Sequence, residues 1–496
     1  MNKCHGECDR TAAQRKGGRV PTLAGVLMLA LAVQGCASLR SHHGAVEAGD
    51  VPARWSVAGG VAANGPSPLV LWWTRFGDME LTALVDQALR ANTSVAGAQA
   101  ALRQAVALRD VSAAGLLPVI AGSASAQRST GRNGAGNSIQ AGLDANWEVD
   151  VFGANRSALR AAESTARASA ASLGDVRVSI AAEVALEYIA LRSAQARLEI
   201  ARANLVSQQE TLQLTQWRLQ AGLVTSLEAE QARAAAEQTS AQLPTLQTSI
   251  EQSSHALAVL TGRAPAALSN ELAPPGVVPQ AADDLALRIP AETLRQRPDV
   301  RAAEDQVAAA VARADQADAA RWPTFQLGGS VGLSAMTLGS LASGASVISA
   351  LVASVSVPVF DGGAARAQVR AQEAALDQAQ ATYRSVILTA LKDVEDALVA
   401  LRGDRERLAH LEQAAEAASN AALLARQRYG SGLVDFQIVL ETQRTQLSTQ
   451  DGVASARADV SADHVRLYKA LGGGWVPDPG DSTPAAADSA ARAPRS

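Results

Sequence analysis

The first cysteines of the chain have the spacing of a metal site. Cys4, His5 and Cys8 stand within "CHGEC", and thiolate and imidazole groups at such short spacing are typical zinc ligands. This segment comes before an apolar run, "VPTLAGVLMLALAVQGC" at 20–36, which has the length and the small-residue ending of a secretory signal. We therefore expect residues 1–35 to be a signal peptide that is removed with the metal-like motif, and we expect no metal site in the mature chain.

Cys36 carries the chemistry that would survive this cleavage. The ending Val33-Gln34-Gly35-Cys36 resembles a bacterial lipobox, in which the cysteine thiol receives a diacylglycerol and becomes the first residue of the mature chain. We expect a covalent diacylglycerol and an N-acyl lipid at Cys36, and no other cofactor. The alternative is a plain signal peptide with a cysteine at this place by chance.

The composition excludes several classes of function. The net charge is only −4, so we expect no nucleic-acid partner. Charged residues make up 19% of the chain and aromatic residues 3%, and alanine is abundant, which suits close-packed helices. The sequence contains no glycine-rich phosphate loop, ligand cluster or nucleophile motif, so we predict no enzyme and no catalytic residue.

The chain contains two copies of one unit. The segment "EVALEYIALRSAQARL" at 183–198 matches "DVEDALVALRGDRERL" at 393–408. The segment "AGLV" at 221–224 matches "SGLV" at 431–434 with the same offset of 210 residues. A chance match would not keep one offset over such a distance, so we infer an internal duplication.

Each copy is predicted to run helix, strand pair, long helix, turn and returning helix. The stretch 154–221 contains no proline and would form a helix of ~100 Å at ~1.5 Å per residue. The predicted bounds begin with a lipidated extended segment at 36–77. The first repeat spans 78–261, with a leading helix at about 78–115, strands at about 119–128 and 138–151, and a helical hairpin at 154–261 whose tip lies near 222–225. A linker or equatorial segment at 262–297 precedes the second repeat at 298–471, which has strands at about 324–334 and 346–358 and a hairpin at 364–471 with its tip near 432–435, and a disordered tail follows at 472–496.

The strand segment "SIQAGLDANWEVDVFG" alternates between apolar and polar residues, which predicts a strand with two different faces. One parity holds Ile139, Leu143 and Trp147, and the other holds Asp144, Glu148 and Asp150. Four strands with open edges cannot lie in lipid alone, so partner chains are needed, and three copies would give twelve strands and twelve helices. The apolar parity would then face lipid and the acidic parity a water-filled lumen. The alternative is a small soluble sheet with a solvated acidic face.

The hairpin tips lie farthest from the strands, so we expect them to form the periplasmic mouth of the channel. The tip residues are Gly222, Leu223 and Thr225 in the first copy and Gly432, Leu433 and Asp435 in the second. Glycine permits the positive φ that ends a helix. Threefold symmetry would make Asp435 a ring of three carboxylates that attracts cations and restricts the mouth. The alternative is an N-cap aspartate of the returning helix, and both could hold.

Five motifs carry a resemblance to a known family. They are "LWWTRFGDMELTALVDQALRANTSVAGAQAAL" at 71–102, "WEVDVFGANRSALRAAE" at 147–163, "RQRPDVRAAE" at 295–304, "PVFDGG" at 358–363 and "RQRYGSGLVDFQIVLETQR" at 426–444. In this order, over about 50–472, the chain resembles the outer-membrane factor lipoproteins of tripartite RND-type efflux pumps, the TolC-like family.

The resemblance implies a mainly α fold with a membrane β-barrel. The homotrimer would form a twelve-stranded barrel in the outer membrane on a twelve-helix barrel across the periplasm. It implies a passive efflux conduit that docks with a periplasmic adaptor and an inner-membrane RND-type pump, and tips that contact the adaptor and close the pore. The alternative is a type I protein-secretion duct of the same fold. An adhesin or coiled-coil stalk would explain the helices but not the strand pairs.

Overall fold

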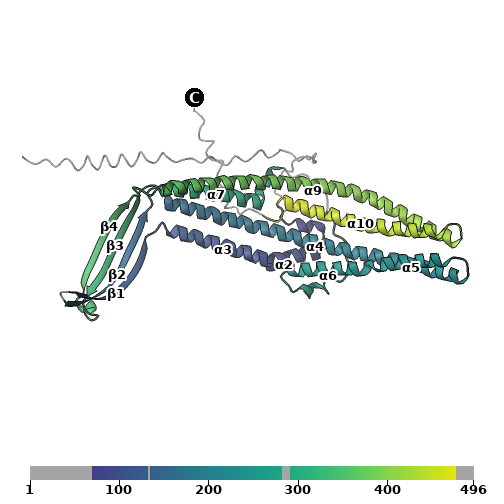
Figure 1. Ribbon diagram of the computed structural model, residues 1–496, viewed down its shortest axis with the longest axis horizontal. Helices are drawn as coiled ribbons and strands as arrows, with labels where there is room; N and C mark the ends of the chain where they lie inside the picture. Colours follow the sequence, from purple (N-terminus) through teal and green to yellow (C-terminus); the bar gives the residue numbers. More distant parts are fainter. Residues whose placement is uncertain (1–69, 132–133, 282–290, 476–496) are drawn as a thin grey trace, which may run out of the picture. The chain divides into compact units, whose positions relative to one another are not determined.

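The computed structural model describes residues 70–131, 134–281 and 291–475 (Figure 1). The predicted signal peptide, Cys36 and nearly all of the predicted tail lie outside these residues. The elements in chain order are η2 (Trp72–Phe76), α2 (Met79–Ala91), α3 (Thr93–Ala114), β1 (Val119–Gly131), β2 (Gly134–Val149), α4 (Ala154–Gln220), α5 (Ser226–Ser240), α6 (Gln242–Leu260), η3 (Pro265–Leu268), η5 (Ala291–Gln296), α7 (Pro298–Ala319), β3 (Thr324–Ala335), α8 (Ser340–Ser343), β4 (Ser346–Ser356), α9 (Ala364–Gly430) and α10 (Phe436–Ala470).

The two long helices, α4 and α9, have 67 residues each. Gly153 precedes α4 with φ 84° and Gly363 precedes α9 with φ 89°, a backbone conformation that glycine adopts without steric cost. None of the helices in the described part of the chain has the length and apolar character that crossing a bilayer requires. The equal lengths and the matching glycines place the same strand-to-helix turn in both repeats.

The four strands form one antiparallel sheet in the order β1–β2–β3–β4. The sequence indicated two separate strand pairs, and the pairing of β2 with β3 joins them. Leu143 lies opposite Val331 in this pairing, and Trp147 lies opposite Leu327. The apolar parity predicted for β2 therefore continues onto a strand of the other repeat.

The strand bounds differ from the predicted ones where glycine and asparagine are frequent. β1 continues to Gly131 and β2 begins at Gly134, so most of the predicted loop between 128 and 138 is paired strand. This loop prediction is wrong because glycine and asparagine indicate a turn without fixing where the ladder of hydrogen bonds stops. β2 ends at Val149 rather than 151, and β4 ends at Ser356 rather than 358.

Each strand is connected along the chain to one helix of a layer. α3 leads into β1, β2 into α4, α7 into β3, and β4 into α9. The helices contact one another in the order α3–α4–α7–α9, the same order as the strands (Figure 1). α4 and α7 bury many alanine side chains, among them Ala168, Ala171, Ala309 and Ala314, and small contact residues allow short distances between helix axes. The abundance of alanine in the sequence thus allows the helices of this layer to pack closely.

Two helices that the sequence predicted as continuous are interrupted. The predicted helix at 78–115 breaks at Asn92, whose backbone is extended and whose Oδ1 accepts hydrogen bonds from the backbone N–H groups of Ser94 (2.8 Å) and Val95 (3.3 Å). This side chain caps α3 and so competes with a continuous helix. The predicted returning helix at 225–261 breaks at Ala241, just before Pro244, because proline has no N–H for the helical ladder.

A buried arginine joins α4 to α2 and to the segment around Pro274. The Arg192 guanidinium donates from Nη1 to Gln195 Oε1 (2.7 Å) and to the Pro274 carbonyl oxygen (2.8 Å), and its Nη2 pairs with the Glu80 carboxylate. The Tyr188 hydroxyl donates to Glu80 Oε2 at 3.2 Å, and burial raises the pKa of Tyr188. Because the Arg192 side chain is only 5% exposed, its charge depends on these partners.

Candidate functional site

The two hairpin tips have the same backbone geometry. Gly222 and Gly432 both have φ 72°, and the following residues, Leu223 and Leu433, donate their backbone N–H to the carbonyl oxygens of Arg218 (2.8 Å) and Arg428 (2.9 Å). This is the Schellman pattern, in which glycine ends a helix at the residue with positive φ. Leu223 is 74% and Leu433 75% exposed, so each tip presents an apolar side chain to its surroundings.

Thr225 and Asp435 stand at the N-cap positions of α5 and α10, and both are exposed. Neither side chain accepts a capping hydrogen bond from its helix. The alternative that Asp435 is there to cap α10 therefore has no hydrogen bond to support it. Asp435 is exposed at the tip, where its carboxylate is accessible to an ion or a partner.

The tips of the two repeats are joined by residues that the sequence analysis did not single out. Arg218 donates from Nη1 to the Tyr429 carbonyl oxygen (3.1 Å) and from Nη2 to that of Gly430 (2.9 Å). Its guanidinium carbon lies 4.5 Å from the centre of the Tyr429 ring, within the range of a cation–π interaction. The Tyr429 hydroxyl donates to Glu228 Oε2 at 3.4 Å. In the sequence, the feature that could have indicated this contact is Tyr429, the aromatic residue next to the tip in "RQRYGSG".

The apolar face of the sheet extends over all four strands. Leu143 is 55% exposed and Trp147 37%, while Ile139 is half-buried. The register gives this face the side chains of Ile120, Ile139, Leu143, Trp147, Phe325, Leu327, Val331, Leu333, Val347, Leu351 and Val355. A continuous apolar surface of this size marks an interaction with lipid or protein.

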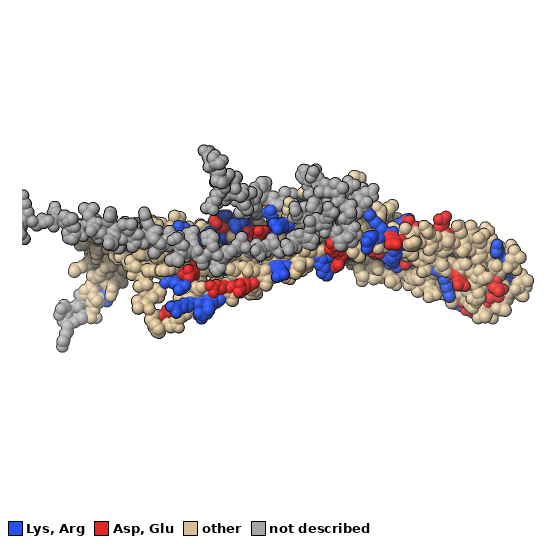
Figure 2. All heavy atoms as spheres, turned by 90° about the horizontal axis from the view of Figure 1, so that it is seen from above, with Lys and Arg blue, Asp and Glu red and all other residues tan. Residues whose placement is uncertain are grey.

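The opposite face of the sheet is polar but carries little charge. Its polar side chains include Ser123, Ser125, Gln127, Asp144, Asn146, Glu148, Gln326, Ser330, Ser334 and Ser354, and β4 adds the apolar Ile348 and Val352. Asp144 Oδ2 accepts a hydrogen bond from the Ser123 hydroxyl at 3.0 Å, and Glu148 Oε1 accepts one from Asn155 Nδ2 at 3.5 Å. Figure 2 shows blue and red side chains gathered along the helices. In the four described strands, only Arg128, Asp144 and Glu148 are charged.

Asp150 does not belong to this strand face, which corrects the prediction. It follows the last residue of β2, and its Oδ2 accepts a hydrogen bond from the backbone N–H of Arg156 at 2.8 Å. Asp361 does the same in the second repeat, where the backbone N–H groups of Ala365 and Gly363, both at 2.8 Å, hold the pKa of Asp361 below its usual range. Both carboxylates satisfy the unpaired N–H groups at the start of a long helix.

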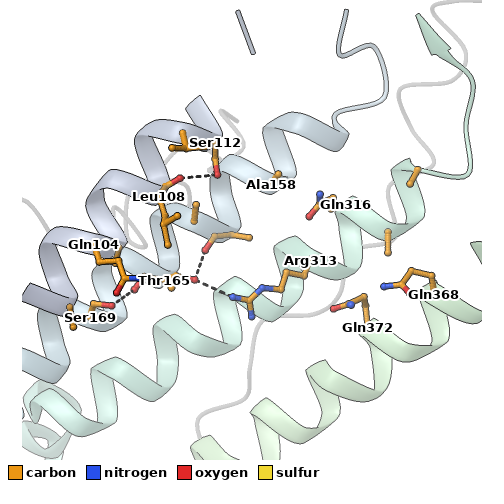
Figure 3. Close-up of a pocket in the computed structure, with 17 residues that line it drawn as sticks. Gln104, Leu108, Ser112, Ala158, Thr165, Ser169, Arg313, Gln316, Gln368 and Gln372 are labelled. Carbon is orange, nitrogen blue, oxygen red and sulfur yellow. Dashed lines mark hydrogen bonds between the residues drawn. The ribbon is translucent and has the colours of Figure 1, made fainter. Parts of the chain in front are cut away.

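A cavity of about 860 Å³ lies among the four helices of the layer, close to the sheet (Figure 3). Its polar lining includes Gln104, Ser112, Thr165, Ser169, Arg313, Gln316, Gln368 and Gln372. Within the described residues, no group of three or more His, Cys, Asp and Glu side chains could hold a metal ion. None of the polar residues that line this cavity was predicted from the sequence as a site residue.

Known proteins share this architecture over nearly the whole chain. A family model described as outer membrane efflux protein matches residues 84–263 and 289–473. The chain is 32% identical to the pyoverdine export outer membrane protein OpmQ of Pseudomonas aeruginosa over 453 residues, which cover 86% of this chain and 92% of that protein. It is 31% identical to the outer membrane protein OprJ of the same species over 458 residues, which cover 90% of this chain and 95% of OprJ.

A solved structure agrees with these relatives. The structure of the outer-membrane channel OprN superimposes with a TM-score of 0.82 at 35% identity, covering 86% of this chain and 98% of that one. The two segments matched by the family model coincide closely with the two repeats, and the predicted fold class of duplicated helical hairpins with few strands is confirmed. The chain therefore belongs to the outer membrane efflux protein family and is an efflux channel component of the outer membrane.

Proposed function

We propose that three copies of this chain close into one passive conduit for small toxic compounds. The observation that carries the proposal is the four-stranded sheet, which has an exposed apolar face and two open edges, β1 and β4. Open edges leave backbone groups unpaired, which lipid does not tolerate, and single-chain barrels begin at about eight strands. Three sheets supply twelve strands, and the helical layers below them supply twelve helices.

In this assembly the two faces of the sheet have different surroundings. Leu143, Trp147 and Ile139 face lipid, while Asp144 and Glu148 face the water-filled lumen. The support is the register, which keeps the apolar and polar parities apart on β2 and β3, although β4 adds the apolar Ile348 and Val352 to the polar face. A lumen lined by serine, glutamine and a few carboxylates allows polar solutes to pass without binding them tightly. We assign no catalytic residue to it.

The hairpin tips are the docking surface for a periplasmic adaptor, which connects the channel to an inner-membrane pump of the RND type. The support is the exposure of Leu223 and Leu433 on turns that are otherwise held by backbone hydrogen bonds. The name of OpmQ states that this relative exports pyoverdine, a cargo of that protein. Export of small compounds is therefore favoured here over the protein-secretion alternative.

The lipid anchor at Cys36 remains part of the proposal and has a direct test. Cells that express the wild-type protein should incorporate a radioactive fatty acid into it, and Cys36→Ser should abolish the label because the acceptor thiol is gone. The variant should still reach the outer membrane, since its own sheet provides the lipid-facing surface. A wild-type protein that takes up no label would remove the lipid from this account.

The channel itself is tested by ion conductance in planar bilayers. Purified wild-type protein should form pores, and Asp435→Ala should raise their conductance or shift the reversal potential under a salt gradient toward lower cation preference. The reason is that three carboxylates in a narrow mouth attract cations. Thr225→Ala removes the side chain at the equivalent position of the first repeat and is the matched control.

The thermal midpoint of unfolding distinguishes the two interpretations of Asp435, as a helix cap or as a residue of the gate. Loss of a capping aspartate costs about 0.5–2 kcal/mol. Because the Asp435 carboxylate makes no capping hydrogen bond, we expect Asp435→Ala to leave the thermal midpoint of unfolding unchanged. Reversal potentials that are identical for wild type and Asp435→Ala would exclude Asp435 from the gate, and a protein without pores would contradict the conduit itself.

A further inference from the structure

We propose that the cavity among α3, α4, α7 and α9 is a contact site for anionic solutes on their way through the channel, centred on the Arg313 guanidinium. The inference rests on the proposed function, because it requires that the cavity opens into a lumen shared by three chains. The polar residues that form the site, here named the arginine belt, are Gln104, Thr165, Arg313, Gln316, Gln368 and Gln372.

The residues that line the cavity show on which side of the helical layer it lies. The four helices stand side by side in the order α3–α4–α7–α9, and yet Gln104 of α3 and Gln368 and Gln372 of α9 line the same cavity. The outermost helices can share one cavity only on the side toward which the layer curves. When three copies close into a ring, this concave side is the inside, so the cavity becomes a section of the lumen.

The cavity lies close to the sheet along the helices. Its lining residues on α4 run from Ala158 to Ser169, within about four turns of the start of that helix at Ala154. Every solute that passes from the helical section to the sheet must cross this level. Figure 3 shows the Arg313 guanidinium directed toward Thr165, and Gln316, Gln368 and Gln372 line the same cavity.

Arg313 is the single charged residue among those that line the cavity, and no carboxylate lines it. Its side chain is exposed, and Nη2 donates to Thr165 Oγ1 at 3.2 Å, which holds the guanidinium in place and uses one of its five N–H donors. A guanidinium presents its N–H groups as a planar fork that matches carboxylate, phosphate and sulfonate oxygens. An anionic solute is therefore the ligand that this geometry fits.

The glutamines and alanines around Arg313 complete the site. Gln316, Gln368 and Gln372 each carry an amide with two donors and one acceptor oxygen, which can replace water around a polar solute without adding charge. The rest of the cavity is lined mostly by alanines, such as Ala101, Ala162 and Ala320, and by the apolar Leu108 and Val111. A weak site of this kind suits a conduit, because a solute must also leave it.

The positive charge of Arg313 is opposite in sign to the carboxylates on the sheet and at the hairpin tip. Asp144 and Glu148 lie on the polar face of the sheet, and Asp435 lies at the tip. Exposed charges are screened over ~10 Å at 0.1 M salt, so each level acts on a solute mainly at close range. Three copies of Arg313 at one level would thus attract anions locally even though the chain as a whole is mildly acidic.

The test measures block of single channels in planar bilayers by naphthalene-1,5-disulfonate, a small dianion, in wild type and three variants. Arg313→Gln should raise the half-blocking concentration by about tenfold, because hydrogen bonds to charged groups are among the stronger ones. Arg313→Lys keeps the charge without the planar fork and should fall between the two. Arg321→Gln removes a charge from the same region, where Arg321 pairs with Asp318 at 2.8 Å outside the cavity lining, and should match wild type.

The outcomes separate this inference from the proposed function. Wild-type pores that conduct but are not blocked, or equal block of wild type and Arg313→Gln, would overturn the arginine belt and leave the conduit intact. An equal loss of block in Arg321→Gln would show a general charge effect and would also overturn it. A protein that forms no pores would overturn the conduit, and the arginine belt with it.

Discussion

Leu143→Arg is expected to prevent assembly of the trimer in the outer membrane. Leu143 is 55% exposed at the centre of the apolar face and lies opposite Val331 of β3. In the proposed barrel its side chain faces lipid, where an arginine near the membrane midplane costs ~2–4 kcal/mol per chain. Because three chains carry the change, the cost is incurred three times in each assembled channel.

The matched control is Asp144→Arg, which places the same side chain one residue away on the polar face. It loses the hydrogen bond from the Ser123 hydroxyl but leaves the arginine in water, so assembly should be retained. Light scattering of the detergent-solubilised protein, together with its amount in the outer-membrane fraction, gives the measurement. Equal trimer yields for Leu143→Arg and Asp144→Arg, or a stable wild-type monomer with full β content, would contradict the assignment of the two faces.

Glu80→Ala is expected to destabilise the chain by about 1.5–3 kcal/mol, because it leaves a buried guanidinium without its counter-ion, while the 40% exposure of the Glu80 side chain weakens the pair through solvent screening. Arg192 is 5% exposed and cannot lose its proton, so the positive charge persists after the carboxylate is removed. The remaining hydrogen bonds to Gln195 and Pro274 do not neutralise it. The measurement is the thermal or denaturant midpoint of the purified protein, read by the loss of helical circular dichroism.

The control for this prediction is an ion pair on the surface of the same helix. Glu199 and Arg202 lie 2.8 Å apart, and both side chains are about half exposed, so Glu199→Ala should cost less than about 1 kcal/mol. Glu80→Gln keeps an acceptor oxygen for Arg192 and should fall between Glu80→Ala and wild type. A loss for Glu80→Ala no larger than that for Glu199→Ala would show that Arg192 tolerates burial without a counter-ion.

The sequence by itself determined the features that repeat over short distances. The period of two around Leu143 and Asp144 predicted a strand with two faces, and the uninterrupted stretches before Gly222 and Gly432 predicted two long helices that end at tips. The offset between the repeats predicted that both copies share these features. Such signals are local, because the side-chain direction of a strand or helix follows from backbone geometry alone. Asn92 and Pro244 were local signals too, and they explain the two helix breaks that the prediction missed.

Only the tertiary structure decided which distant residues meet. The pairing of β2 with β3, the buried charge of Arg192, the contact of Arg218 with Tyr429 and the cavity around Arg313 each join segments far apart in the chain. Periodicity does not specify such partners, because the same apolar strand or polar side chain fits many neighbours until the chain has packed. The polar residue after β2 shows this most clearly: Asp150 follows the alternation of the strand, but the unpaired N–H groups of α4 bind its carboxylate.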